Sequence, residues 1–117
     1  MSFKFEKLII WQKSMDLGEE AHKLATSFPK DELFNLSSQL KRAADSIALN
    51  IAEGSIAQSN PEQQRFLGYA LRSLAEVVTC LYKSKSRKYI KDENFKILYD
   101  DSFNLMNMIL AFRKNIK

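Results

Sequence analysis

The fold of this chain is decided by residues 37–55, which read SSQLKRAADSIALNIAEGS. Apolar side chains recur there every three or four positions, which is the spacing of one face of an α-helix. Together with the leucine just before the stretch, this apolar stripe consists of Leu36, Leu40, Ala43, Ile47 and Ile51. Gly54 lies where we expect the helix to end, because glycine adopts the left-handed cap conformation without steric penalty.

A second, polar row runs along the same predicted helix, away from the apolar stripe. At about 100° per residue, one face carries Arg42, Ser46, Leu49 and Glu53, with Gln39 and Asn50 on its flank. One interpretation is structural: Arg42 pairs with Glu53 of another subunit or with Glu76 of a later helix, since buried charges persist only when paired. The other is a ligand or partner site lined by Arg42, Asn50 and Glu53. Leu49 among small residues favours a helix face pressed against a second subunit.

A first helix is predicted over residues 5–27, before the polar row. Phe28 and Pro29 end it, because the residue before a proline is pushed out of the helical region. Gly18 interrupts its apolar face and indicates close packing there. In the connection that follows, we expect Leu33 and Phe34 to cover one end of the core.

Two more helices follow the central stretch. For the third, Asn60 is predicted as the cap, Pro61 takes the first helical position, and the helix runs to about Arg87. The fourth is predicted to start at Asp92, and its apolar seam alternates spacings of three and four through Phe95, Leu98, Ser102, Leu105, Ile109, Phe112 and Ile116. We therefore predict one all-α domain over residues 1–117, a left-handed up-down-up-down four-helix bundle.

Composition narrows the class of protein further. A chain of 117 residues with net charge +4 and a pI near 9.2 has the size of one domain, and its charge permits contact with nucleic acid or an acidic partner. Cys80 is the single cysteine, which excludes an internal disulfide and fits a reducing cytoplasm. The start of the chain does not resemble a signal peptide, and the longest apolar run, residues 108–112, is too short to span a membrane. We expect a cytoplasmic protein.

Catalytic chemistry finds little support in the sequence. Glu19 and His22 have the spacing of a di-iron ligand pair, but that site needs a second such pair and His22 is the only histidine. The serines lack a partner that would activate them, and there is no glycine-rich phosphate loop. We expect a non-enzymatic protein without metal or cofactor.

A basic cluster lies near the end of the third helix. Five cations fall within nine positions, interleaved with Tyr82 and Tyr89: Lys83, Lys85, Arg87, Lys88 and Lys91. Arg65 and Arg72 add positive charge on the same helix. Lysine and arginine attract phosphates, and a tyrosine ring can stack on an unpaired base, so the cluster is a candidate nucleic-acid site. The alternative is a solvated helix end that complements the helix dipole.

The central stretch also carries a resemblance to a known family. Its segments QLKRAADSI and NIAEG resemble the signature of four-helix bundle proteins encoded in intervening sequences of bacterial 23S ribosomal RNA genes. That family is also similar to the accessory variability determinant of diversity-generating retroelements. The likeness extends along nearly the whole chain and includes Trp11-Gln12-Lys13, Phe28-Pro29 with Glu32, Phe66-Leu67 and Ser73-Leu74-Ala75-Glu76. The family tends to carry Ala-Arg-Gly-Ser where this chain reads ALRS at residues 70–73.

The resemblance implies an assembly and partners. The retroelement relatives form barrel-shaped homopentamers that contact nucleic acid and a reverse transcriptase, so a homopentamer with RNA, DNA or such a protein as partner is implied here. The residues themselves indicate an oligomer, because Leu49, Phe66, Tyr69 and Val78 exceed what one core requires. The alternative is a protein assembly or scaffold module without a nucleic-acid role.

Overall fold

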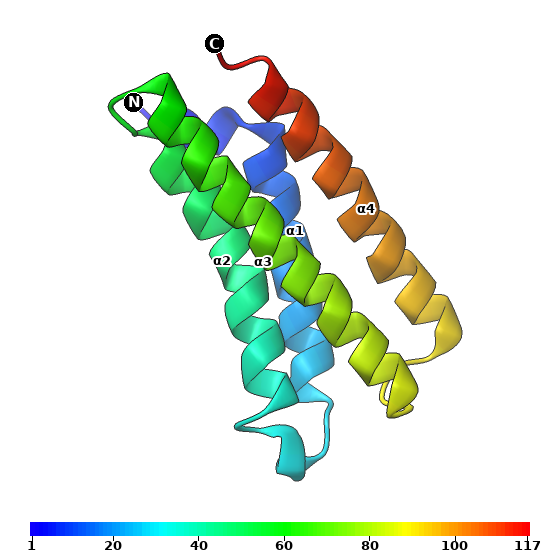
Figure 1. The fold of residues 1–117 in the computed structure, drawn as a ribbon. Coiled ribbons are helices and arrows are strands. Elements are labelled where there is room, and N and C mark those ends of the chain that lie inside the picture. Colours follow the sequence, from blue (N-terminus) through cyan, green and yellow to red (C-terminus); the bar gives the residue numbers. More distant parts are fainter.

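Four long antiparallel helices make up the protein. The computed structural model describes all 117 residues, and its elements are η1 (Lys4–Lys7), α1 (Ile9–Thr26), η2 (Lys30–Glu32), α2 (Leu36–Ser55), α3 (Asn60–Ser86) and α4 (Asp92–Lys114), where η denotes a 3-10 turn. Consecutive long helices run in opposite directions, and the molecule measures 43 × 25 × 24 Å (Figure 1). The predicted up-down-up-down four-helix bundle is confirmed. None of the helices combines the length and apolar character needed to cross a membrane.

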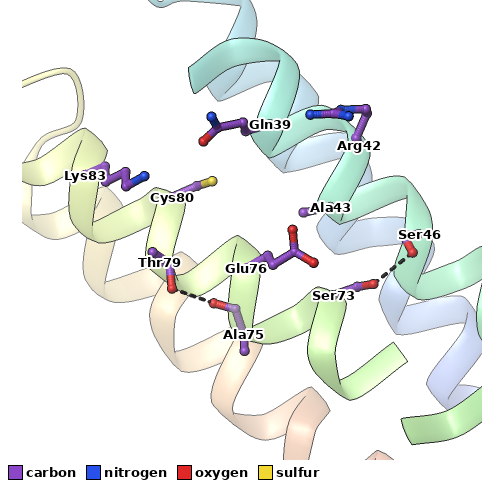
Figure 2. Close-up of a pocket in the computed structure, with 10 residues that line it drawn as sticks. All are labelled: Gln39, Arg42, Ala43, Ser46, Ser73, Ala75, Glu76, Thr79, Cys80 and Lys83. Atoms are coloured by element: carbon purple, nitrogen blue, oxygen red, sulfur yellow. Dashed lines mark hydrogen bonds between the residues drawn. The ribbon is translucent and has the colours of Figure 1, made fainter. Parts of the chain in front are cut away.

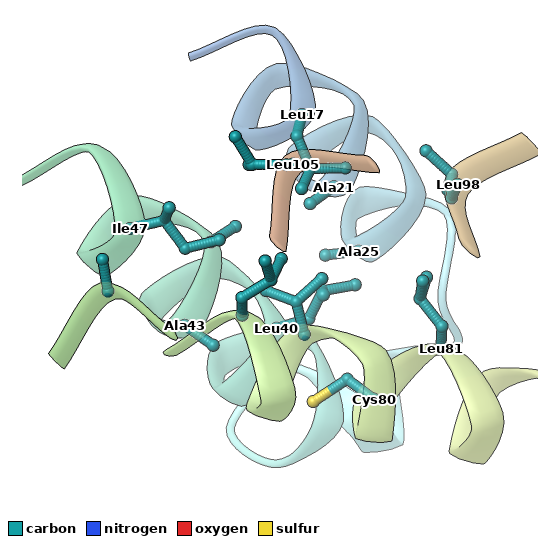
Figure 3. Packing of buried hydrophobic residues seen from close by; sticks show 14 of the residues in the cluster. Leu17, Ala21, Ala25, Leu40, Ala43, Ile47, Cys80, Leu81, Leu98 and Leu105 are labelled. Carbon is teal, nitrogen blue, oxygen red and sulfur yellow. The ribbon is translucent and has the colours of Figure 1, made fainter. Parts of the chain in front are cut away.

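The core is built around the apolar stripe of α2. Leu36, Leu40 and Ile47 are completely buried, which confirms the predicted inward face. Side chains from the other three helices converge on this stripe, among them Ala21 of α1, Leu81 of α3 and Leu105 of α4 (Figure 3). The predicted seam of α4 is buried from Phe95 to Ile109, and Phe112 and Ile116 are half-buried against the core. Cys80 is buried in the same cluster.

Two helix starts differ from the prediction. Residues 4–7 form a separate 3-10 turn, and Leu8 then takes an extended conformation with ψ 123°, so α1 begins at Ile9 rather than near residue 5. The cap of α3 is Ser59 rather than Asn60, because the Ser59 hydroxyl accepts the Glu62 amide at 3.2 Å. The side chain of Asn60 instead donates to the carbonyl of Lys117.

Gly54 is not the left-handed cap that the sequence indicated. It lies inside α2, which continues to Ser55, and no glycine of the chain has a positive φ. A Cβ at Gly54 would lie 3.0 Å from Cβ of Phe66 and 3.4 Å from the carbonyl oxygen of Gln63. The glycine is therefore needed for the close approach of α3 to the end of α2.

Both ends of α4 are tied to other elements. Near its carboxyl end, Arg113 donates through Nε to the carbonyl of Gln64 at 2.8 Å, and the Gln64 amide donates to the carbonyl of Ile116 at 2.8 Å. These bonds fasten the end of α4 to the start of α3. Just before its amino end, the hydroxyl of Tyr89 reaches across to the η2 turn.

Candidate functional site

A buried carboxylate organises the loop end of the bundle. Glu32 is only 7% exposed and accepts hydrogen bonds from the Tyr89 hydroxyl at 2.8 Å, Arg87 Nη1 at 3.0 Å and Asn35 Nδ2 at 3.0 Å. The hydrogen bond from Tyr89, followed by those from the Leu36 amide and Asn35, lowers the pKa of Glu32 despite its burial, and the bond between Tyr89 and Glu32 raises the pKa of Tyr89. Glu32 thus joins the α1–α2 connection to the α3–α4 connection.

The sequence did not predict that Glu32 joins these two connections. It predicted instead that neighbouring residues cover this end of the core. Leu33 and Phe34 were expected to cover the end of the core, but both are exposed, Phe34 to 93%. Phe28 fills that place instead, with its ring 5.2 Å from the ring of Tyr89. In the sequence, Glu32 was singled out only as one of the residues that carry the family resemblance. No local pattern links it to Arg87 and Tyr89, which lie more than fifty positions away.

Two cations of the basic cluster at residues 83–91 have partners within the protein. Arg87 is the ion-pair partner of Glu32, and Lys88 occupies a turn with φ 63°. Lys91 lies at the N-cap of α4. Lys85 packs against α4, with Nζ 4.6 Å from the centroid of the Phe95 ring. Arg87 and Lys85 are therefore engaged within the protein, although all five cations of the cluster are exposed.

Lys83 of this cluster shares one face of α3 with two arginines. Positions 65, 72 and 83 are separated by seven and eleven residues, close to whole numbers of helical turns, so Arg65, Arg72 and Lys83 point the same way. The guanidinium of Arg72 lies 5.7 Å from the ring of Tyr69, and that of Arg65 lies 5.9 Å from the ring of Phe66. We call Arg65, Tyr69 and Arg72 the arginine stripe. Neither arginine forms an ion pair, since the four ion pairs of the chain involve other residues.

The excess charge of the chain is concentrated here. Residues 60–91 hold seven lysines and arginines against two acidic residues, Glu62 and Glu76, a net charge of +5, whereas the whole chain carries +4. The remaining residues together are thus slightly acidic. Four of these cations lie on α3 and three in the loop that follows it. The positive field of this part of the chain favours contact with an anionic partner.

A polar cleft of about 490 Å³ lies beside this face, between α2 and α3 (Figure 2). Its lining comes from both helices: Gln39, Arg42, Ala43, Ser46, Ser73, Ala75, Glu76, Thr79, Cys80 and Lys83. Figure 2 shows the carboxylate of Glu76 directed into the space between the helices. The cleft exists because Ala43, Ser73 and Ala75 are small.

Three residues of the polar row of α2 line this cleft, namely Gln39, Arg42 and Ser46. Ser46 and Ser73 are joined by a hydroxyl–hydroxyl bond of 2.8 Å, and Asn50 donates to the Ser46 hydroxyl at 2.9 Å and to its carbonyl at 2.8 Å. Arg42 and Glu76 form no ion pair, so the expected pairing of these two within one chain is absent. Both are exposed.

The outer part of the row faces away from the core. Leu49 is 60% exposed and Glu53 is exposed without an ion-pair partner in its own chain. Leu49 and Glu53 thus lie on a helix face that another molecule can reach.

His22, which the sequence offered as a candidate metal ligand, lies beside a carboxylate of α2. Its Nε2 lies 2.8 Å from Oδ1 of Asp45 on α2. The chain holds no group of three histidine, cysteine, aspartate or glutamate side chains arranged to bind a metal ion.

Comparisons with known proteins complete the description. The model of a protein family described as "23S rRNA-intervening sequence protein" matches residues 6–111. Among solved structures, the chain is similar to a protein of unknown function from the S23 ribosomal protein family of Bacteroides thetaiotaomicron, with 24% identity and a TM-score of 0.85. That similarity covers 92% of this chain and 100% of the other, and it shows a shared fold. A search of curated proteins gives no match.

Proposed function

Because this chain belongs to the 23S rRNA-intervening sequence protein family, we propose that it is a non-enzymatic, oligomeric bacterial protein of the cytoplasm that contacts RNA or other nucleic acid through a basic surface. The observation that carries the proposal is the arginine stripe. It combines two cations that have no counter-ion in the protein with an exposed aromatic ring between them.

The geometry of the stripe suits a strand better than an isolated anion. Arg65 and Arg72 are seven residues apart, or about 10.5 Å along the helix, which is roughly three base steps of a stacked strand. Both guanidinium groups can therefore contact phosphates of one strand, and Tyr69 lies between them where a base can stack. Neither arginine has to leave an ion pair in order to bind a phosphate.

Salt titration of a charge-reversal variant tests the proposal. We expect Arg65→Glu with Arg72→Glu to weaken binding of all single-stranded oligonucleotides alike and to lower the salt slope by about one per lost phosphate contact. The measurement is fluorescence anisotropy at increasing salt concentration. The matched control is Lys13→Glu with Lys114→Glu, an equal charge change on α1 and α4. Absence of binding by the unmodified protein at low salt would refute the proposal, and an unchanged slope in the variant would place the contact at Lys85 and Lys88 instead.

A protein assembly module is the second candidate function, and one observation favours it. An apolar groove of about 330 Å³ lies between α3 and α4, lined by Leu71, Leu74, Ala75, Val78, Tyr99, Ser102, Phe103 and Met106. A partner held there, such as a reverse transcriptase, would be retained at high salt, because apolar burial is not screened. Phe103→Glu would then abolish retention of that partner and leave any nucleic-acid affinity unchanged.

A further inference from the structure

The carboxylate of Glu76 is out of place in a surface built to hold phosphates. It lies on the same face of α3 as Arg72 and Lys83, four and seven residues away from them. A carboxylate repels a phosphate, yet no cation of the chain lies within ion-pair distance to neutralise it. Its side chain lines the α2–α3 cleft instead. A ligand group that donates hydrogen bonds would explain an unpaired acceptor at this position.

The serine pair near Glu76 can donate a hydrogen bond, whereas the Glu76 carboxylate can only accept one. Ser46 and Ser73 share one hydrogen bond, and Asn50 donates a second to the Ser46 oxygen. Two hydroxyl groups carry two protons, and only one of these is used between them. Whichever hydroxyl donates, one proton has no acceptor in the chain, and both oxygens line the cleft. Because Ser73 and Glu76 are three residues apart on α3, the cleft presents a hydroxyl donor and a carboxylate acceptor on neighbouring positions of one helix.

We propose that the α2–α3 cleft receives an unpaired guanine of the bound strand, an inference that rests on the proposed nucleic-acid function. Guanine carries two donors in line, N1–H and the N2 amino group, and both can donate to the two oxygens of Glu76 in a bidentate pair. Its O6 is an acceptor next to N1 and takes the free hydroxyl proton of the serine pair. Arg72 and Lys83, eleven residues apart on α3, can hold phosphates of the same strand about five base steps from each other.

The other bases fit this arrangement less well. Adenine and cytosine present one amino group beside an acceptor nitrogen, which would face a Glu76 oxygen and repel it. Uracil has a single N–H between two carbonyl oxygens, with the same result. Proteins that bind RNA by sequence take unpaired bases out of the strand and read this Watson–Crick edge. The preference for guanine thus comes from its bidentate contact with the Glu76 carboxylate.

Oligonucleotides with one variable base provide the test. A single-stranded oligouridine with one central guanine, adenine or inosine is titrated by fluorescence anisotropy at fixed salt. We expect the guanine strand to bind about tenfold more tightly than the adenine strand, as for a bidentate base contact. The inosine strand should fall between them, because inosine lacks the N2 amino group.

Two variants separate base recognition from charge. Glu76→Gln keeps the shape of the side chain but has only one acceptor oxygen, so the preference for guanine over adenine should disappear while overall binding persists. Glu19→Gln makes the same charge change at an exposed position on α1 and should leave the preference intact. Equal binding of all three strands by the unmodified protein, or a preserved preference in Glu76→Gln, would overturn this inference and leave the proposed function standing. Binding to no strand would refute the proposed function itself.

Discussion

Glu32 illustrates how a single buried charge can hold two distant connections together. Its carboxylate accepts hydrogen bonds from Asn35, just before α2, and from Arg87 and Tyr89 between α3 and α4, with the backbone amide of Leu36 as a fourth donor at 3.4 Å. No buried polar side-chain atom of the protein lacks a partner. A buried carboxylate is tolerated only under such conditions, because the hydrogen bonds replace the water it has lost.

This cluster should make the free energy of unfolding depend on pH. The pKa of Glu32 is lowered in the folded protein, chiefly by the Tyr89 hydroxyl, so the unfolded chain binds the proton more readily. The stability from Glu32 is then present above about pH 4 and is lost as the pH falls through the folded pKa. The pKa of Tyr89 is raised, so its contribution is present below about pH 10 and is lost as the pH rises through the folded value. Thermal unfolding followed by circular dichroism across this range measures both limits.

Two variants identify the groups responsible. Glu32→Gln should lower the melting temperature at neutral pH and flatten the acid limb of the stability curve. Tyr89→Phe should remove the loss of stability that Tyr89 causes at alkaline pH. It should also bring the acid pH at which the contribution of Glu32 is lost closer to the pKa of an ordinary carboxyl. An acid limb of equal steepness in the original protein and in Glu32→Gln would show that other carboxylates cause the acid dependence.

For the helices, sequence patterns predicted which helices form and which of their faces are buried much better than where each helix begins and ends. The apolar stripe of α2 and the seam of α4 could be predicted because their side chains repeat at the helical period and face one core. The start of α1 and the cap of α3 could not, since each depends on one or two backbone angles. The cleft between α2 and α3 depends on which small residues face each other across helices, and a single sequence does not reveal that pairing.

The glycines of two helices provide a test of this packing. Gly54→Ala should lower the free energy of unfolding by about 1–3 kcal/mol, because its Cβ would meet the Cβ of Phe66 at 3.0 Å and α3 would have to shift. Gly18→Ala is the matched control. The nearest atom to its Cβ is the carbonyl oxygen of Ala44 at 4.0 Å, so alanine fits there and should raise the same quantity by about 0.5–1 kcal/mol. Urea unfolding of both variants gives the values, and stabilisation by Gly54→Ala would contradict the packing argument.

The whole molecule presents more apolar surface than a solitary bundle requires. Leu49 on α2 and Tyr69 on α3 are exposed near the polar cleft, while Phe103 and Leu110 are exposed on α4. The charge distribution is also uneven, with the basic excess on α3 and the loop after it. Two different faces of one chain can meet in a heterologous contact, and such contacts close into a ring when the rotation from one subunit to the next closes on itself. These features support the proposed homo-oligomer.

Leu49→Asp tests this assembly. We expect the substitution to dissociate the oligomer, because it places a charge in the proposed subunit contact, and to leave helix content unchanged, since Leu49 has no role in the core. Analytical ultracentrifugation at micromolar concentration gives the mass, and circular dichroism gives the helix content. Leu110→Asp, a similar change at an exposed position near the end of α4, is the control. A mass near 13.5 kDa for the unmodified protein would exclude the oligomer.

The attachment of α4 at both ends has a consequence for how the native protein opens. Its amino end is held through Tyr89 and its carboxyl end through Gln64 and Arg113, so neither end is free to fray independently. Detachment of this helix requires both fastenings to break, and it then leaves as one cooperative unit. Native-state hydrogen exchange should therefore show the amides along α4 converging on one common opening free energy, without the gradual loss of protection toward the carboxyl terminus that a loosely tethered last helix displays.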